Sequence, residues 1–190
     1  MERLQPLVLV GGASLRFGRD KLREPVGSGW LVDRPIAALR AVFGPCVAAV
    51  GECHESVAAR ADLVLPDRLP GIGPLGGIVS ALEASDGGVF VLAGDLPAMT
   101  ETTVRQVLDA AAAAPDAPAV LAQTSGVEPC IGIYRQAALP ELRRAAADGR
   151  HAMHDAIRPL RCVLVAIPPG QALNANSPDE LRRSLPQQAS

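Results

Sequence analysis

Lysine is almost absent from this sequence. Arginine accounts for seventeen of the 18 Lys and Arg residues, which leaves Lys21 as the single lysine. A chain rich in Ala, Arg, Gly and Pro is typical of a GC-rich genome. Where most basic positions have become Arg, a retained Lys indicates a position that needs a compact ammonium rather than a planar guanidinium. Chance retention of one lysine is the alternative.

Cysteine is also scarce, and its pattern excludes several classes of protein. The four cysteines form no C-x-x-C pair, and neither they nor the three histidines show the spacing of zinc ligands. No apolar run approaches the ~20 residues that span a bilayer. Only six residues precede the first apolar run, which argues against a secretory signal. These absences predict a reduced, soluble, cytoplasmic protein.

Strong charge of either sign is missing too. The net charge is −2 and the sequence pI is about 5.9. Neither value suggests broad binding to nucleic acid or to an anionic membrane. The 190 residues, 48% of them hydrophobic, are enough for a real core and favour one domain over 1–190. The polar tail 186–190 is expected to fray.

Short apolar runs alternate with helical patterns along the chain. The runs predict strands at 6–10, 46–51, 63–66, 89–95, 119–123, 130–135 and 162–168. Helices are predicted at 33–43, 54–60, 74–85, 100–114, 139–149, 151–158 and 177–185, with Asp33 and Thr100 as candidate N-caps. This order predicts an α/β fold, Rossmann-like and three-layered, with helices on both faces of a mostly parallel sheet.

Ligands of such sheets bind beyond the carboxyl ends of the strands. The loops of interest are therefore 11–20, 66–74, 94–98, 124–129 and 168–177.

The loop after the first strand combines glycine with basic residues. Gly11-Gly12 allows successive backbone N–H groups to cradle phosphate oxygens, and Arg16, Arg19 and Lys21 add positive charge. It is not a Walker A motif, because Leu rather than Ser or Thr follows Lys21, and it is not G-x-G-x-x-G. On these residues alone, a tight turn with solvated arginines fits equally well.

The full string G-G-x-S-x-R-F-G-x-D-K, residues 11–21, is more specific. It resembles the signature loop of nucleotidyltransferases with a Rossmann-like core, and most closely that of the molybdenum cofactor guanylyltransferase (MobA) family. Phe17 stands where Met is more usual. Four further blocks resemble the family in the same order: PDRLPGIGPLGGI (66–78), LAGDLP (92–97), EPCIGIYR (128–135) and NANSPDEL (174–181).

The resemblance implies an enzyme that transfers GMP from GTP to the phosphate of molybdopterin, with Mg²⁺ as cofactor and pyrophosphate as leaving group. Molybdoenzyme apoproteins or chaperones are the implied downstream partners. A cytidylyltransferase or another small-molecule nucleotidyltransferase of the same fold is an alternative. A non-catalytic nucleotide-binding homologue is another. An NAD- or FAD-dependent oxidoreductase would fit the fold, but its fingerprint is missing.

Carried onto this sequence, the resemblance also implies site residues. Leu9, Val10, Gly11 and Gly12 would present backbone groups to the nucleotide, with Arg19 as a further phosphate partner. Lys21 would neutralise charge on the triphosphate, and Arg16 would assist it as a catalytic residue.

Acidic and amide side chains complete the implied site. Asp95 would hold the metal, although a helix cap is the alternative. Asp67 would contact base or ribose, although a turn former explains it nearly as well. Asn174 and Asn176 would lie toward the pterin.

One departure from the family concerns the end of the second strand. Val50 and Gly51 stand where some members have a nucleotide-contacting Asn, and neither can supply that amide. Base selectivity would then rest on backbone contacts, or the nucleotide would differ from GTP.

Overall fold

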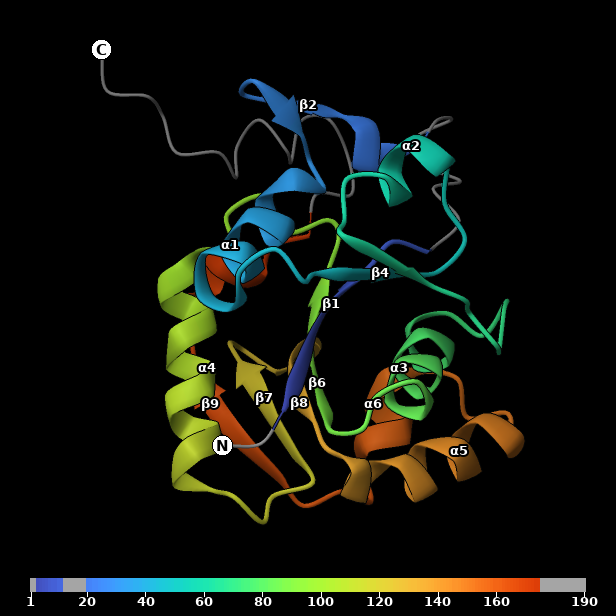
Figure 1. The fold of residues 1–190 in the computed structure, drawn as a ribbon. Helices are drawn as coiled ribbons and strands as arrows, with labels where there is room; N and C mark the ends of the chain where they lie inside the picture. Colours follow the sequence, from blue (N-terminus) through green and yellow to red (C-terminus); the bar gives the residue numbers. More distant parts are fainter. Residues whose placement is uncertain (1–2, 12–19, 175–190) are drawn as a thin grey trace.

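A seven-stranded sheet forms the centre of the protein (Figure 1). The structure, a computed structural model, describes residues 3–11 and 20–174. The strands of this sheet are β1 (Leu4–Leu9), β4 (Ala48–Val50), β5 (Leu63–Leu65), β6 (Gly88–Ala93), β7 (Ala119–Gln123), β8 (Val127–Tyr134) and β9 (Cys162–Ala166). Their order is β5-β4-β1-β6-β8-β7-β9. Only β8 runs antiparallel to its neighbours, so the predicted mostly parallel sheet is confirmed.

Helices cover both faces of the sheet, as the alternation of strands and helices predicts. They are α1 (Asp33–Phe43), α2 (Glu55–Ala58), α3 (Pro74–Glu83), α4 (Glu101–Ala113), α5 (Leu139–Ala147) and α6 (Met153–Ile157). In Figure 1, α1 and α4 lie on one face, and α3, α5 and α6 on the other. Successive residues of a strand serve opposite faces. Val8 and Val10 pack on the α1 and α4 side, whereas Leu7 and Leu9 pack on the α3 side.

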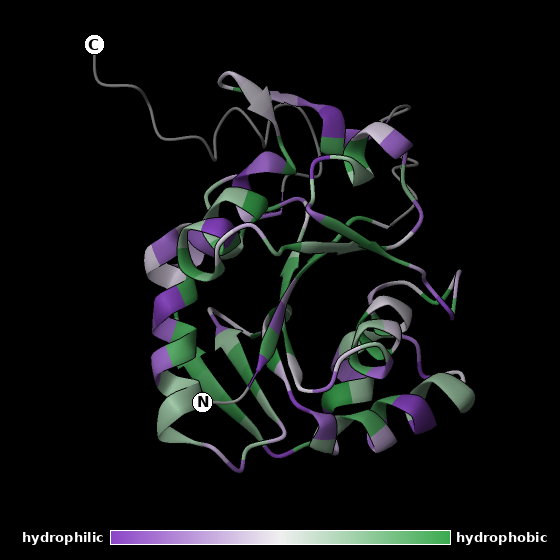
Figure 2. Ribbon diagram, viewed as in Figure 1, coloured by the Kyte–Doolittle hydropathy of each residue, from purple (hydrophilic) through white to green (hydrophobic). Residues whose placement is uncertain are grey.

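The inner strands are mostly apolar because both of their faces are covered (Figure 2), whereas the edge strands β5 and β9 are partly exposed. All seven predicted strands are present, with boundaries shifted by a few residues. Among the described residues, no helix combines the length and apolarity that crossing a membrane requires. The predicted helix 177–185 and the tail 186–190 lie outside the described residues.

A small hairpin was not predicted. It consists of β2 (Pro25–Val26) and β3 (Gly29–Trp30), which pair antiparallel beside the main sheet. Strands of two residues are too short to show any periodicity in a sequence. The hairpin also changes the start of α1: Val32 occupies the N-cap position, and the Asp33 carboxylate accepts a hydrogen bond from the Trp30 amide at 2.7 Å.

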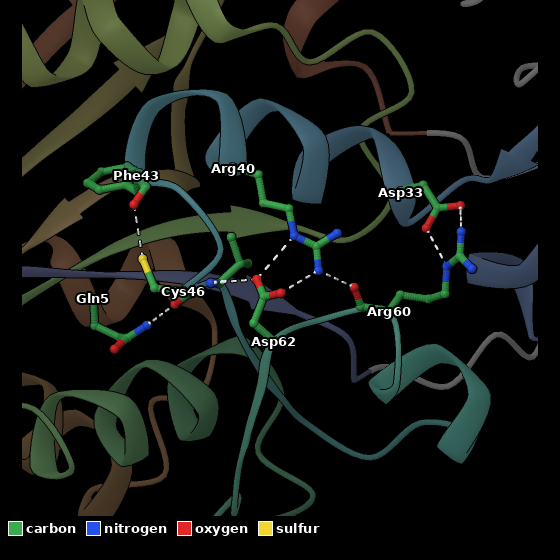
Figure 3. A network of polar contacts seen from close by, with 8 residues as sticks. Gln5, Asp33, Arg40, Phe43, Cys46, Arg60 and Asp62 are labelled. Atoms are coloured by element: carbon green, nitrogen blue, oxygen red, sulfur yellow. Dashed lines mark hydrogen bonds and ion pairs between the residues drawn. The ribbon is translucent and has the colours of Figure 1, made fainter.

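A network of polar contacts fixes α1 to the segment between β4 and β5 (Figure 3). The Arg40 guanidinium on α1 donates to both carboxylate oxygens of Asp62, at 3.1 and 2.8 Å, and to the Arg60 carbonyl at 2.8 Å. Asp62 also accepts from the Val47 amide at 3.0 Å. Arg60 donates two bonds to Asp33, both at 2.6 Å. The segment 60–62 after α2 is therefore attached to both ends of α1, at Asp33 and at Arg40.

This network predicts a specific dependence of stability on pH. The hydrogen bond from Arg40 lowers the pKa of Asp62 below its usual value. A carboxyl whose pKa is lowered by folding stabilises the protein above its unfolded pKa, about 4, and that contribution disappears as pH falls through the folded pKa. The pair is half-exposed, so its contribution is about 1 kcal/mol or less. Urea unfolding of Asp62→Asn should show lower stability than wild type at pH 7 and a shrinking difference below about pH 4. An equal difference at both pH values would contradict this assignment.

Candidate active site

A cavity of about 320 Å³ opens at the carboxyl ends of β1 and β4. Its volume is in the range of small-molecule sites. It lies beside β1, where the strand order reverses: from β1 the chain continues to β4 and β5 on one side and then returns to β6 on the other. Open α/β sheets bind ligands at such a point. The residues that line it are Leu9, Gly11, Val50, Gly51, Glu52, Asp67, Gly71, Gly73, Pro74 and Gly77.

At Gly11 and Gly51, the lining of the cavity is bare backbone. Gly51 has φ +122°, and a Cβ placed there would lie 2.5 Å from the Gly11 nitrogen. The ends of β1 and β4 therefore touch through main-chain atoms, and a ligand can approach the backbone closely.

We expect Gly51→Ala to lower stability by about 1–3 kcal/mol, since the side chain would need both a strained φ and a shift of the β1 terminus. It should also weaken binding at the nucleotide site that the resemblance predicts for this loop. Gly126→Ala is the matched control, because a Cβ at Gly126 meets nothing within 4 Å. Thermal unfolding and nucleotide titration of both variants check the prediction, and a stable Gly51→Ala protein that binds normally would contradict it.

The wall formed by residues 67–73 is fastened to α3. The Asp67 carboxylate accepts from the Leu69 amide at 3.0 Å and from the Ser80 hydroxyl at 3.4 Å. The buried Ser80 hydroxyl also accepts from the Arg68 amide at 2.9 Å. Asp67 thus forms its own turn and lines the cavity as well, so the two interpretations of this residue are compatible.

A pair of charged side chains lies on the other side of β1 from the cavity, where β6 ends. The Lys21 ammonium donates to the Asp95 carboxylate at 2.5 Å, and both side chains are largely buried, at 19% and 16% exposure. Asp95 follows β6, whose end is joined to β1 by a hydrogen bond from the Gly94 amide to the Leu9 carbonyl. The 3₁₀ turn Lys21–Arg23 begins with Asp20, whose side chain accepts from the Leu22 amide at 3.1 Å.

The sequence around Asp95 gives no sign of this pair, because no basic residue follows Asp95 before Arg105. The structure brings Lys21 to it from 74 residues away. The alternative role of Asp95 as a helix cap is wrong, because Thr100 caps α4.

The turn that carries Lys21 is connected to the α2 segment. Trp30 in the β2–β3 hairpin has the guanidinium carbons of Arg23 and Arg60 at 5.5 and 5.2 Å from its ring centroid. Such cation–π contacts contribute about 0.5–1 kcal/mol each at exposed sites. Because Arg60 also binds Asp33, the hairpin, α1 and the residues that follow α2 are joined. Together they support both the cavity and the Lys21–Asp95 pair.

Cys130 on β8 lies close to Asp95. Burial, together with the negative charges of Asp95 and Glu128, raises the pKa of its thiol to about 12. The thiol is therefore protonated at neutral pH, and a protonated thiol is a poor nucleophile. This environment therefore disfavours nucleophilic chemistry at Cys130.

The structure brings together several of the predicted residues. Leu9, Gly11 and Asp67 share the cavity, and Lys21 and Asp95 form the pair. Val10 is buried in the core, and its amide donates to the Val50 carbonyl at 3.0 Å. It does not line the cavity.

Other predicted residues lie at the margin or beyond the described chain. Asn174 is exposed and follows the 3₁₀ turn Pro169–Ala172, which Gln171 attaches to the start of α4 through Thr100 and Thr103. The remaining predicted site residues, Gly12, Arg16, Arg19 and Asn176, lie outside the described residues.

One contributor to the cavity was missed. The loop after β4 supplies Glu52, yet it was not among the loops singled out from the sequence. It also follows a strand of a parallel sheet, so the same rule would have found it.

Comparison with known proteins is consistent with this geometry. A profile of the MobA-like NTP transferase domain matches residues 6–163. The probable molybdenum cofactor guanylyltransferase of Chloroflexus aggregans is 30% identical over 93% of this chain and 90% of its own. The molybdenum cofactor guanylyltransferase of Rhodobacter capsulatus is 31% identical over 96% and 95%.

A solved structure of molybdopterin-guanine dinucleotide biosynthesis protein A from Archaeoglobus fulgidus has the same fold. The TM-score is 0.77 over 94% of this chain and 95% of that one, at 23% identity.

The fold and the relatives define a nucleotidyltransferase of the Rossmann-like α/β class. Within that class, the chain belongs to the MobA-like NTP transferase family.

Proposed function

We propose that this enzyme transfers GMP from GTP to molybdopterin and releases pyrophosphate. The observation that carries the proposal is the Lys21–Asp95 pair, placed on one side of the β1 terminus with the glycine-lined cavity on the other. The proposal is supported by relatives that are named molybdenum cofactor guanylyltransferases.

The sheet order suggests how the nucleotide lies. The cavity is lined from β4, β1 and the start of α3, whereas Lys21 and Asp95 meet where β6 ends. A nucleotide laid across the strand ends would place its base in the cavity and its triphosphate toward Lys21. Leu9 and Gly11 would contact it in between through their backbone, and Asp67 would border the ribose.

The reaction needs alignment and charge neutralisation more than proton transfer. An oxygen of the molybdopterin phosphate attacks the α-phosphorus of GTP, a new P–O–P bond forms, and the bond to the β-phosphate breaks. Because the nucleophile is already an anion, no strong general base is required. Lys21 stabilises charge that develops on the departing pyrophosphate. Arg16, Arg19 and Gly12 are proposed as further phosphate contacts, and Asn174 and Asn176 as contacts to the pterin.

Mg²⁺ is the proposed metal, and Asp95 the residue that would hold it. Within the described part of the chain, no group of three or more His, Cys, Asp or Glu side chains is placed to hold a metal. A single carboxylate suits Mg²⁺, which proteins commonly bind through one or two carboxylates plus substrate phosphates. When bound, the metal would neutralise triphosphate oxygens. Lys21 would then have to exchange its contact with Asp95 for one with the nucleotide.

A reaction in the cytoplasm, with delivery of the product to molybdoenzyme apoproteins or their chaperones, completes the proposal. Its test is pyrophosphate release by the purified protein with molybdopterin, Mg²⁺ and each of the four nucleoside triphosphates in turn. We expect release with GTP. Release with CTP alone would support the cytidylyltransferase alternative. No release with any nucleotide would support a non-catalytic homologue.

A further inference from the structure

Among the described residues, two carboxylates line the cavity, and they differ in their hydrogen-bond partners. Asp67 is engaged by Leu69 and Ser80 within its own turn. Glu52, in contrast, is exposed and lines the cavity. Across the described residues, its carboxylate makes no hydrogen bond or ion pair. Glu52 therefore has both of its oxygens available to a ligand.

The backbone around Glu52 is held in place before any ligand binds. On one side, Gly51 packs against the Gly11 backbone, with the constrained φ described above. On the other side, Cys53 packs against the core, and His54 caps α2 by accepting from the Ser56 amide at 3.2 Å. Beyond α2, Arg60 is bound to Asp33 on α1 (Figure 3). Because this backbone is already fixed, little conformational entropy is lost when the Glu52 carboxylate binds a ligand.

The hydrogen-bond donors and acceptors of each base decide which base a carboxylate can select. It offers two acceptor oxygens side by side and no donor. Guanine presents two adjacent donors, N1–H and the 2-amino group, which match both oxygens. Adenine and cytosine each present an amino group beside an unprotonated ring nitrogen, whose lone pair would face a carboxylate oxygen. Uracil presents one N–H between two carbonyls. Guanine alone among the four satisfies both oxygens without repulsion.

We propose that Glu52 is the residue that selects guanine, by accepting hydrogen bonds from N1–H and the 2-amino group of the base. The inference rests on the proposed function, because it takes the cavity as the base site of that reaction. It also accounts for the departure noted in the sequence: Val50 and Gly51 supply no side-chain amide, and the next residue supplies a carboxylate instead.

Base analogues test the assignment through binding alone. Inosine triphosphate lacks the 2-amino group. The wild type should therefore bind GTP about 10- to 100-fold more tightly than inosine triphosphate, which is the contribution of one charge-assisted hydrogen bond. In xanthosine triphosphate a carbonyl replaces the 2-amino group and would face a carboxylate oxygen. The wild type should therefore bind it less tightly than GTP.

Glu52→Gln should reverse this preference. The glutamine amide accepts from N1–H and donates to the 2-carbonyl of xanthine, so this variant should bind xanthosine triphosphate more tightly than GTP. Its preference for GTP over the inosine nucleotide should fall toward one. A gain of binding cannot arise from misfolding. Glu55→Gln is the matched control, since Glu55 is exposed on α2 and does not line the cavity; it should behave as wild type.

Calorimetric titrations of the three proteins with the three nucleotides and Mg²⁺ give the answer without any turnover. If Glu52→Gln still prefers GTP over both analogues, the assignment is overturned. Base selection by Glu52 together with an absence of pyrophosphate release would refute the proposed reaction alone. Release from GTP with an unchanged base preference in Glu52→Gln would refute the role of Glu52 alone.

Discussion

Asp95→Asn should reduce turnover to below about one hundredth of the wild-type rate, because it removes the carboxylate proposed to hold the metal while keeping the shape of the side chain. GTP binding, in contrast to turnover, should be strengthened by the same substitution. In the resting site, the Asp95 carboxylate both engages Lys21 and repels a triphosphate. Removing that charge ends the repulsion of the triphosphate and the competition between Asp95 and phosphate for Lys21. The variant should therefore bind GTP more tightly than wild type in the presence of a chelator.

Calorimetric titration of GTP with Mg²⁺ and with chelator, for wild type and variant, separates the two effects. The wild type should depend on Mg²⁺ for binding, and Asp95→Asn should depend on it much less. Asp109→Asn, an exposed carboxylate change on α4, is the control and should match the wild type. Normal turnover by Asp95→Asn would remove Asp95 from the catalytic site.

Lys21→Ala should lower turnover by about a hundredfold, since the loss of one preorganised charge at a transition state costs ~3 kcal/mol. Stability should change less than turnover, because the remaining Asp95 carboxylate lies at the end of β6 with 16% of its side chain exposed, so that water can solvate it. Lys21→Arg should restore only part of the activity, since the guanidinium is larger and its charge is spread over a plane. Arg144→Ala, which removes an exposed cation on α5, should leave turnover unchanged.

Steady-state rates and urea unfolding of these three variants check the prediction. A Lys21→Ala enzyme with wild-type rates would show that the single lysine was retained by chance. A variant that unfolds before it can be assayed would instead assign Lys21 a structural role, contrary to the expectation.

The fold follows from local features of the sequence. Each strand of the main sheet is a short apolar run, and the inner strands are buried on both faces, whereas β5 and β9 at the two edges are partly exposed. The Pro, Gly and Thr signals at helix ends locate α3 and α4 well. The β2–β3 hairpin escaped prediction because its strands have two residues each and its stability comes from tertiary contacts of Trp30.

The site was predictable in part, for a physical reason. Leu9, Gly11, Asp67, Lys21 and Asp95 stand in recognisable motifs, so their types and spacing could be read. Pairing between Lys21 and Asp95 spans 74 residues and depends on how β1 and β6 align. Glu52 belongs to no motif; its place after a parallel strand indicates the right loop, and the packing of Gly51 against Gly11 places it in the cavity.

The most direct test of nucleotidyl transfer is to follow the phosphates of GTP separately. The protein is incubated with molybdopterin, Mg²⁺ and GTP labelled either at the α- or at the γ-phosphate, and the products are separated. The account predicts that the α label appears in the pterin product while the γ label appears in pyrophosphate. A γ label in the pterin, or an α label that remains in free GMP or GDP, would contradict it.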